Sequence, residues 1–208
     1  KKVFDIINEI SFVKSKRYDI DSYYSLKCSA EQFQYIYRQY DKYLRKKRKI
    51  DFDDMLVYTY ELFAARKDIL AGWQNRFRYI LVDEFQDINS IQYDIVKMLA
   101  EPENNLFAVG DDDQSIYGFR GSDPSFMQKY TTDYRDAKKI ILDVNYRCSG
   151  NIMNSAARLI KHNDVRLDKN IVPYKDAGYA VDIKGFETPA DEYREVYKLV
   201  DRYINDGA

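Results

Sequence analysis

The sequence predicts an α/β fold in which a mostly parallel sheet is flanked by helices. Three short apolar runs occupy residues 79–82, 106–109 and 140–142. None of them alternates polar with apolar residues, which is typical of strands buried on both faces of a parallel sheet. Segments with helical periodicity separate the runs, so the chain is expected to read strand, helix, strand, helix, strand.

Two helices are expected ahead of the first strand. From Glu31 to Lys49 the apolar residues recur every three or four positions, and this helix ends in a basic run. Between Arg38 and Lys49 lie seven basic residues and one acid, a local charge of +6. The run is either a solvated helix face or a contact with nucleic-acid phosphates. Asp51 is expected to cap the second helix, whose first turn is acidic.

Four further helices are expected after the first strand. Ser90 is a suitable cap for one of them, and Asp123-Pro124 is typical of a cap followed by proline at the first helical position. Another helix should begin near Ser149. Residues 188–191, Thr-Pro-Ala-Asp, form a capping box that opens the last one.

The composition excludes several classes of protein. With 45% hydrophobic and 32% charged residues, the 208-residue chain is neither collagen-like nor wholly disordered. No apolar run approaches the roughly 18 residues of a membrane-spanning helix. Cys28 and Cys148 lie far apart and the chain has a single histidine, so a zinc knuckle and a disulfide framework are excluded. We therefore expect a cytoplasmic protein with no membrane partner.

Acidic residues directly follow the first two apolar runs. Asp83-Glu84 follows the first run, and Gly-Asp-Asp-Asp-Gln at 110–114 follows the second. Ligands of α/β sheets bind at the carboxyl ends of strands, where paired carboxylates are costly unless they hold a cation or act as acid or base. The pattern favours Mg²⁺ held by one carboxylate while its neighbour orients an attacking water, as in nucleotide hydrolysis. Helix-capping acids are the alternative interpretation.

Three segments of the chain carry longer motifs in a fixed order. They are Leu81-Val82-Asp83-Glu84-Phe85-Gln86-Asp87, then residues 109–121, Val-Gly-Asp-Asp-Asp-Gln-Ser-Ile-Tyr-Gly-Phe-Arg-Gly, and then Asn145-Tyr146-Arg147. In sequence and spacing they resemble motifs II, III and IV of the superfamily 1 DNA helicases of the UvrD/Rep/PcrA type. The segment 51–56 resembles the one that precedes motif II in that family. The resemblance implies an ATP-dependent helicase that moves along single-stranded DNA, from 3′ to 5′, and unwinds duplexes.

The resemblance also assigns roles in ATP hydrolysis. Asp83 would bind Mg²⁺, and Glu84 would polarise the hydrolytic water. Gln114 would sense the γ-phosphate of ATP. Tyr146 would stack on the adenine, and Arg147 would reach the γ-phosphate as an arginine finger.

A second set of roles concerns DNA. By the same resemblance, Tyr117, Phe119 and Arg120 would face single-stranded DNA, with Phe119 as a stacking platform where relatives usually have Trp. The implied partners are single-stranded DNA, duplex junctions and the remaining helicase domains.

The phosphate-binding loop of that family, Gly-x-x-x-x-Gly-Lys-Ser/Thr, does not occur in the sequence, because none of the eight glycines is followed by lysine. We therefore expect a central section of a helicase that is inactive by itself. The resemblance implies an incomplete RecA-like (P-loop NTPase) domain at 50–144, preceded by the end of a helical insertion at 1–49 and followed by the start of a second RecA-like domain at 145–208. Two alternatives remain: a non-catalytic single-stranded DNA-binding module, and a carboxylate-metal nuclease using Asp83, Glu84 and Asp111.

Overall fold

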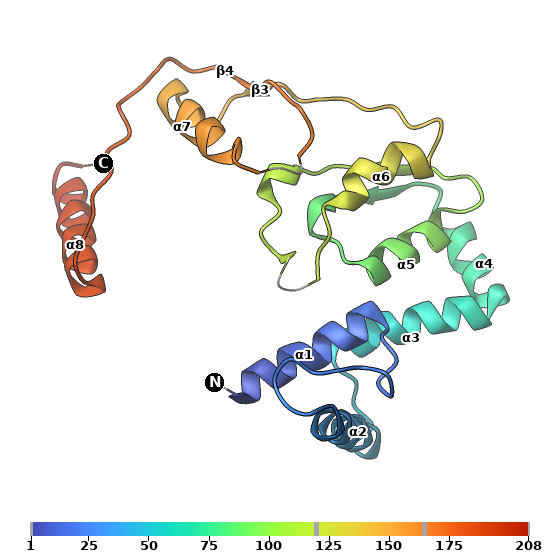
Figure 1. Ribbon diagram of the computed structural model, residues 1–208. Coiled ribbons are helices and arrows are strands. Elements are labelled where there is room, and N and C mark those ends of the chain that lie inside the picture. Colours follow the sequence, from blue (N-terminus) through green and yellow to red (C-terminus); the bar gives the residue numbers. More distant parts are fainter. Residues whose placement is uncertain (1, 119–120, 164–165, 208) are drawn as a thin grey trace. The chain divides into compact units, whose positions relative to one another are not determined.

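The computed structural model describes residues 2–118, 121–163 and 166–207, which fall into two compact units. The first unit runs to Ile140 and includes Arg166 and Leu167, and the second contains the rest of the chain. The first unit consists of α1 (Lys2–Lys16), α2 (Ala30–Lys46), α3 (Phe52–Ala65), α4 (Lys67–Arg76), β1 (Ile80–Val82), the 3-10 helix η1 (Phe85–Asp87), α5 (Ser90–Ala100), β2 (Leu106–Ala108), the 3-10 helix η2 (Asp112–Gln114) and α6 (Ser125–Asp133) (Figure 1). The second consists of β3 (Val144–Asn145), α7 (Gly150–Ile160), β4 (Val172–Pro173) and α8 (Pro189–Asn205).

Two of the helices before the first strand, α2 and α3, form where the sequence predicts them, whereas α1 and α4 were not predicted. Ser29 caps α2 by accepting a hydrogen bond from the Gln32 backbone N–H. Asp51 and Asp54 form a reciprocal capping box at the start of α3, which satisfies backbone donors that the first turn leaves without partners. The expected helix from Glu31 to Lys49 and the cap at Asp51 are therefore confirmed, with α2 ending three residues before Lys49.

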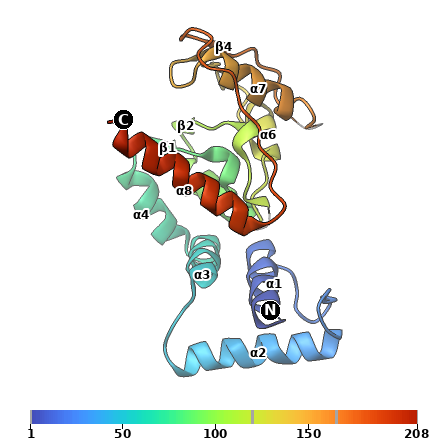
Figure 2. The same ribbon diagram turned by 90° about the vertical axis from the view of Figure 1, so that its left-hand side faces the viewer.

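A small apolar core holds α1 and α2 together. Ile10 and Val13 of α1 pack with Phe33 of α2, and all three side chains are buried. In Figure 2, α2 lies below α1 and runs crosswise to it, and a connecting segment leads from α2 up to α3. Helix α3 packs in turn against α1, α4 and α5. It therefore connects the N-terminal helices to α5, the helix that follows β1.

The sheet of the first unit is a parallel pair, as predicted. Ile80 pairs with Leu106, and Val82 pairs with Ala108. Val82 and Ala108 pack against a core that contains Phe85 and residues of α5 and α6. This packing places helices over one face of the sheet.

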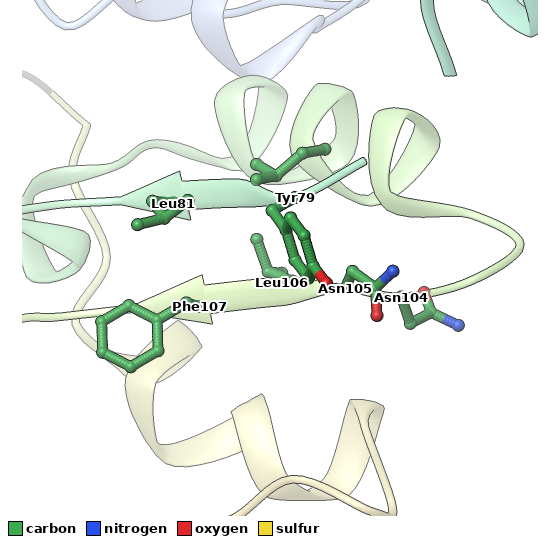
Figure 3. Close-up of a pocket in the computed structure, with 7 residues that line it drawn as sticks. Tyr79, Leu81, Asn104, Asn105, Leu106 and Phe107 are labelled. Atoms are coloured by element: carbon green, nitrogen blue, oxygen red, sulfur yellow. The ribbon is translucent and has the colours of Figure 1, made fainter. Parts of the chain in front are cut away.

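The prediction that both strands are buried on both faces is wrong. Leu81 is 72% exposed and Phe107 is 56% exposed, because alternate residues of a strand lie on opposite faces and helices of the described chain cover only one of them. An open hollow on this sheet is lined by residues 79–81 and 104–107 (Figure 3). None of the candidate site residues lines this hollow.

The prediction of a strand at 140–142 is also wrong. Ile140, Ile141 and Leu142 are exposed and lie outside any strand. A strand needs a neighbour that supplies hydrogen bonds, and the pairing of the second unit instead joins β3 to β4, with Val144 opposite Val172. The apolar run therefore precedes the strand rather than forming it.

Two predicted helix starts differ in detail from the structure. The cap of α5 is Asn89, which forms a capping box with Gln92, and not Ser90. Helix α6 begins at Ser125 with Pro124 as its N-cap, so the predicted cap, Asp123, lies one residue too early, although its carboxylate accepts the Ser125 N–H at 3.0 Å. Ser149 and Thr188 precede α7 and α8, as expected. Among the described residues, no helix combines the length and the apolarity needed to cross a membrane.

Candidate active site

The segments that follow β1 and β2 stay side by side beyond the sheet. The Val109 N–H donates to the Val82 carbonyl at 2.8 Å, and the Phe85 N–H donates to the Val109 carbonyl at 2.9 Å. Two parallel strands bring their carboxyl ends to the same edge. The predicted convergence of Asp83-Glu84 with residues 111–114 at one edge of the sheet is therefore confirmed.

Asp83 and Glu84 are exposed at this edge. Glu84 adopts the left-handed backbone conformation, with φ 50° and ψ 43°, and its N–H donates to Asp83 Oδ1 at 2.9 Å. A non-glycine residue in this region costs on the order of 1–3 kcal/mol, and such strain concentrates at functional sites. The strained turn places two neighbouring carboxylates at the carboxyl end of β1.

Gln86 connects Glu84 to the second strand end. Its side chain is 1% exposed. Gln86 Nε2 donates to Glu84 Oε2 at 2.7 Å, while Gln86 Oε1 accepts the Asp111 backbone N–H at 3.0 Å. Sequence reasoning assigned this residue no role, although a polar side chain between the apolar residues Phe85 and Ile88 was the signal that could have found it.

The candidate phosphate sensor joins the same group of residues. Gln114 is exposed, and its Nε2 donates to Asp111 Oδ2 at 2.7 Å. The hydrogen bonds therefore run without a break from Glu84 through Gln86 and Asp111 to Gln114. The structure brings together three of the residues that the sequence singled out, Glu84, Asp111 and Gln114.

The three consecutive acids at 111–113 offer oxygen atoms within 4.8 Å of one another. Arg166 binds Asp113 through two hydrogen bonds, at 3.0 and 2.8 Å, and the Asp112 carboxylate accepts the Leu167 N–H. A paired carboxylate is a poor ligand for a second cation. Asp83 fits Mg²⁺ better, because its carboxylate is exposed at the strand end and Mg²⁺ is commonly held by one or two carboxylates together with phosphates and water.

In the second unit, Tyr146 and Arg147 follow β3 and are exposed. The Asn145 side chain accepts the Arg147 and Cys148 N–H groups at 3.0 and 2.8 Å, which fixes this turn. The ring of Tyr146 lies against Tyr174, with 5.0 Å between the ring centroids. The roles of Tyr146 and Arg147 at a nucleotide stay predictions.

The DNA-contacting residues lie largely beyond what the structure describes. Tyr117 is exposed, whereas Phe119 and Arg120 fall outside the described residues. Their roles on single-stranded DNA stay predictions.

Comparison with known proteins identifies the family. A family model described as the UvrD/REP helicase N-terminal domain matches residues 2–135. The chain belongs to the UvrD/REP helicase family. The matched range contains Asp83, Glu84, Gln86 and Gln114, so the edge of the sheet described above lies inside the family's own domain.

Individual relatives in the UvrD/REP family are similar over most of this chain. A protein of Bacillus subtilis named putative ATP-dependent DNA helicase YjcD is 47% identical over 168 residues, which are 79% of this chain and 22% of the relative. ATP-dependent DNA helicase PcrA of Staphylococcus epidermidis is 40% identical, and DNA helicase II of Haemophilus influenzae is 41% identical, each over 172 residues, or 83% of this chain and 24% of the relative. The chain spans less than a quarter of the length of these relatives.

Proposed function

We propose that this chain is a central part of an ATP-dependent DNA helicase that couples ATP hydrolysis to 3′ to 5′ movement along single-stranded DNA and to duplex unwinding in the cytoplasm. The observation that carries the proposal is the hydrogen-bonded edge of the sheet, where Asp83 and Glu84 meet Gln114 through Gln86 and Asp111. This edge lies within the range matched by the helicase family model. The names of the relatives support the same activity.

The residues of this edge fit the hydrolytic half of the reaction. The Glu84 carboxylate lies at the edge of the sheet, where the Gln86 amide holds it in place. It accepts the proton of the attacking water. Asp83 would hold Mg²⁺, and the ion would supply positive charge against the phosphates. Gln114 lies on the neighbouring strand end and contacts the γ-phosphate. Holding the β- and γ-phosphates requires the glycine-lysine loop, which these 208 residues do not contain.

Two residues of the second unit and three further residues of the first unit complete the proposed motor. Tyr146 stacks on the adenine, and Arg147 stabilises the charge that develops on the transferred phosphoryl group. Tyr117, Phe119 and Arg120 contact single-stranded DNA. Stacking on an aromatic ring tolerates any base, which suits a motor that moves along DNA regardless of sequence.

The experiment is an ATPase and strand-separation assay of the full-length enzyme with a forked duplex. We expect Mg²⁺-dependent hydrolysis that single-stranded DNA stimulates, together with unwinding. Strand cleavage without ATP would instead support the carboxylate-metal nuclease. Absence of both DNA-stimulated hydrolysis and unwinding would reject the proposal.

A second candidate is a non-catalytic module that binds single-stranded DNA. The observation that favours it is the basic segment at the end of α2, where residues 45–49, Arg-Lys-Lys-Arg-Lys, are all exposed. Exposed cations neutralise DNA phosphates and release counterions. Salt-dependent binding of single-stranded DNA by the 208-residue chain, without ATP hydrolysis by the full-length enzyme, would favour this module over the motor.

A further inference from the structure

We propose that Gln86 is a positioning residue that fixes the Glu84 carboxylate and ties it to the segment that carries Gln114. The inference rests on the proposed function, because it assigns Gln86 a part in ATP hydrolysis through Glu84. It concerns a side chain that contacts neither nucleotide nor metal in the roles described above.

The first support is the way in which Gln86 uses its amide. Its NH₂ group donates to Glu84 Oε2 at 2.7 Å, and its carbonyl oxygen accepts the Asp111 N–H at 3.0 Å. A carboxylate can only accept and a backbone N–H can only donate, so turning the amide over would oppose like groups on both sides. The two partners therefore hold the amide in a single orientation, which a carboxylate or an amine at this position would not reproduce.

The second support is the fit around the amide. Gln86 is 1% exposed, and a buried polar group that loses its partner is costly. Gly110 makes this position possible: a Cβ atom there would lie 2.6 Å from Gln86 Oε1 and 3.1 Å from the Phe85 backbone nitrogen. The absence of a side chain at residue 110 therefore lets the second strand end approach Gln86 closely enough for the hydrogen bond from Asp111.

The third support is the conformation of Glu84. Its left-handed backbone is unfavourable for glutamate, and its side chain is exposed, so the carboxylate needs a partner to hold one direction. Gln86 supplies that partner from the buried side. Since Asp111 also binds Gln114 at 2.7 Å, a displacement of residues 111–114 pulls on Gln86 and reaches Glu84.

The test compares three variants of the full-length enzyme by steady-state ATPase. Gln86→Met keeps the length of the side chain and removes both hydrogen bonds. We expect kcat to fall by about 100-fold or more, because a correctly positioned general base contributes about this factor to the rate. KM should change by less than about threefold. Gly110→Ala should lower kcat in the same way without altering any polar group. The matched control is Gln74→Met, which removes a hydrogen bond to the Met98 carbonyl away from the site and should leave kcat within about twofold.

Gln86→Glu separates positioning from a merely structural role. The new carboxylate still accepts the Asp111 N–H but cannot donate to Glu84 until it is protonated. Hydrogen exchange at the Asp111 amide, measured on the 208-residue chain, should therefore stay as slow in the variant as in the wild type. The ratio of variant to wild-type kcat should rise as the pH falls from about 8 to about 6, because burial beside Glu84 raises the pKa of the introduced carboxyl.

The outcomes are distinct. A wild-type kcat for Gln86→Met in a folded, active enzyme would overturn the inference while leaving the proposed function intact. A pH-independent ratio for Gln86→Glu would also overturn it, since only a donor to Glu84 responds to protonation. An inactive wild-type enzyme would reject the proposed function, and the inference with it.

Discussion

Lys14 is a buried cation whose removal should destabilise the first unit strongly. Its Nζ atom lies 2.7 Å from Asp51 Oδ2 and 2.6 Å from Asp54 Oδ1, and the Lys14 and Asp54 side chains are 4% and 5% exposed. Tyr40 also donates to Asp51, at 2.9 Å. This cluster joins α1, α2 and the capping box of α3. Lys14→Met keeps the apolar stem of the side chain and leaves two carboxylates without their cation.

The expected loss in the free energy of unfolding is about 3–5 kcal/mol, because breaking a buried ion pair leaves an uncompensated buried charge. This is a large share of the roughly 5–15 kcal/mol that stabilises a typical domain. With a urea slope of about 2 kcal/mol per M, a loss of about 4 kcal/mol lowers the unfolding midpoint by about 2 M.

Fluorescence of Trp73, the single tryptophan, follows the urea unfolding of the first unit from α4. The matched control is Arg66→Met, which breaks the exposed pair with Asp68 and should cost less than about 1 kcal/mol. Adding Asp51→Asn and Asp54→Asn to Lys14→Met should recover part of the loss, since no unpaired charge remains. A loss for Lys14→Met as small as that of the control would refute the reasoning.

The cluster also sets a pH dependence. Burial by itself would raise the pKa of Asp51, but hydrogen bonds from Lys14, the Asp54 backbone and Tyr40 lower it below its usual value. A carboxyl with a lowered folded-state pKa stabilises the fold above its unfolded pKa of about 3.9, and this contribution disappears as the pH falls through the lowered value. The difference in stability between wild type and Lys14→Met should therefore be constant near neutral pH and shrink in acid.

Three further predictions concern nucleotide and DNA. The 208-residue chain alone should hydrolyse ATP far more slowly than about one turnover per second, even with single-stranded DNA, because its sequence lacks the glycine-lysine loop that holds the β- and γ-phosphates; faster turnover in a steady-state assay would contradict this. Phe119→Ala in the full-length enzyme should weaken single-strand binding by about 1–3 kcal/mol, measured by fluorescence anisotropy, with an unchanged salt dependence, since stacking releases no counterions. Neutralising Lys46, Lys47 and Lys49 should flatten the salt dependence if they meet phosphates, and an unaltered slope would identify a solvated helix face.

Features set by a few neighbouring residues were predictable from the sequence. The caps at Asp51 and Thr188 depend on a side chain and a backbone N–H three positions away, so the local sequence contains both partners. The meeting of the acidic residues after β1 and β2 could also be predicted, because parallel strands place their carboxyl ends together. The caps follow from such short-range rules, and the convergence of the candidate site follows from the parallel pairing of β1 with β2.

Features that depend on distant partners were not predictable. The run at 140–142 has the composition of a strand, but no neighbouring strand pairs with it in the described part of the chain. Lys14 and Asp51 are 37 positions apart, and no spacing rule connects them. Gln86 was visible in the sequence, yet its role depends on the close approach of Gly110, which only the folded chain provides.

The most direct test of the proposed motor is the effect of Glu84→Gln on the full-length enzyme, measured as the nucleotide dissociation constant and the single-turnover rate of hydrolysis on the same preparation. Mg²⁺ is assigned to Asp83 and water activation to Glu84, so the variant should bind ATP within about threefold of wild type and hydrolyse it at least about 100-fold more slowly. Retained hydrolysis, or a loss of binding in proportion to the loss of rate, would contradict the assignment of the catalytic base to this edge of the sheet.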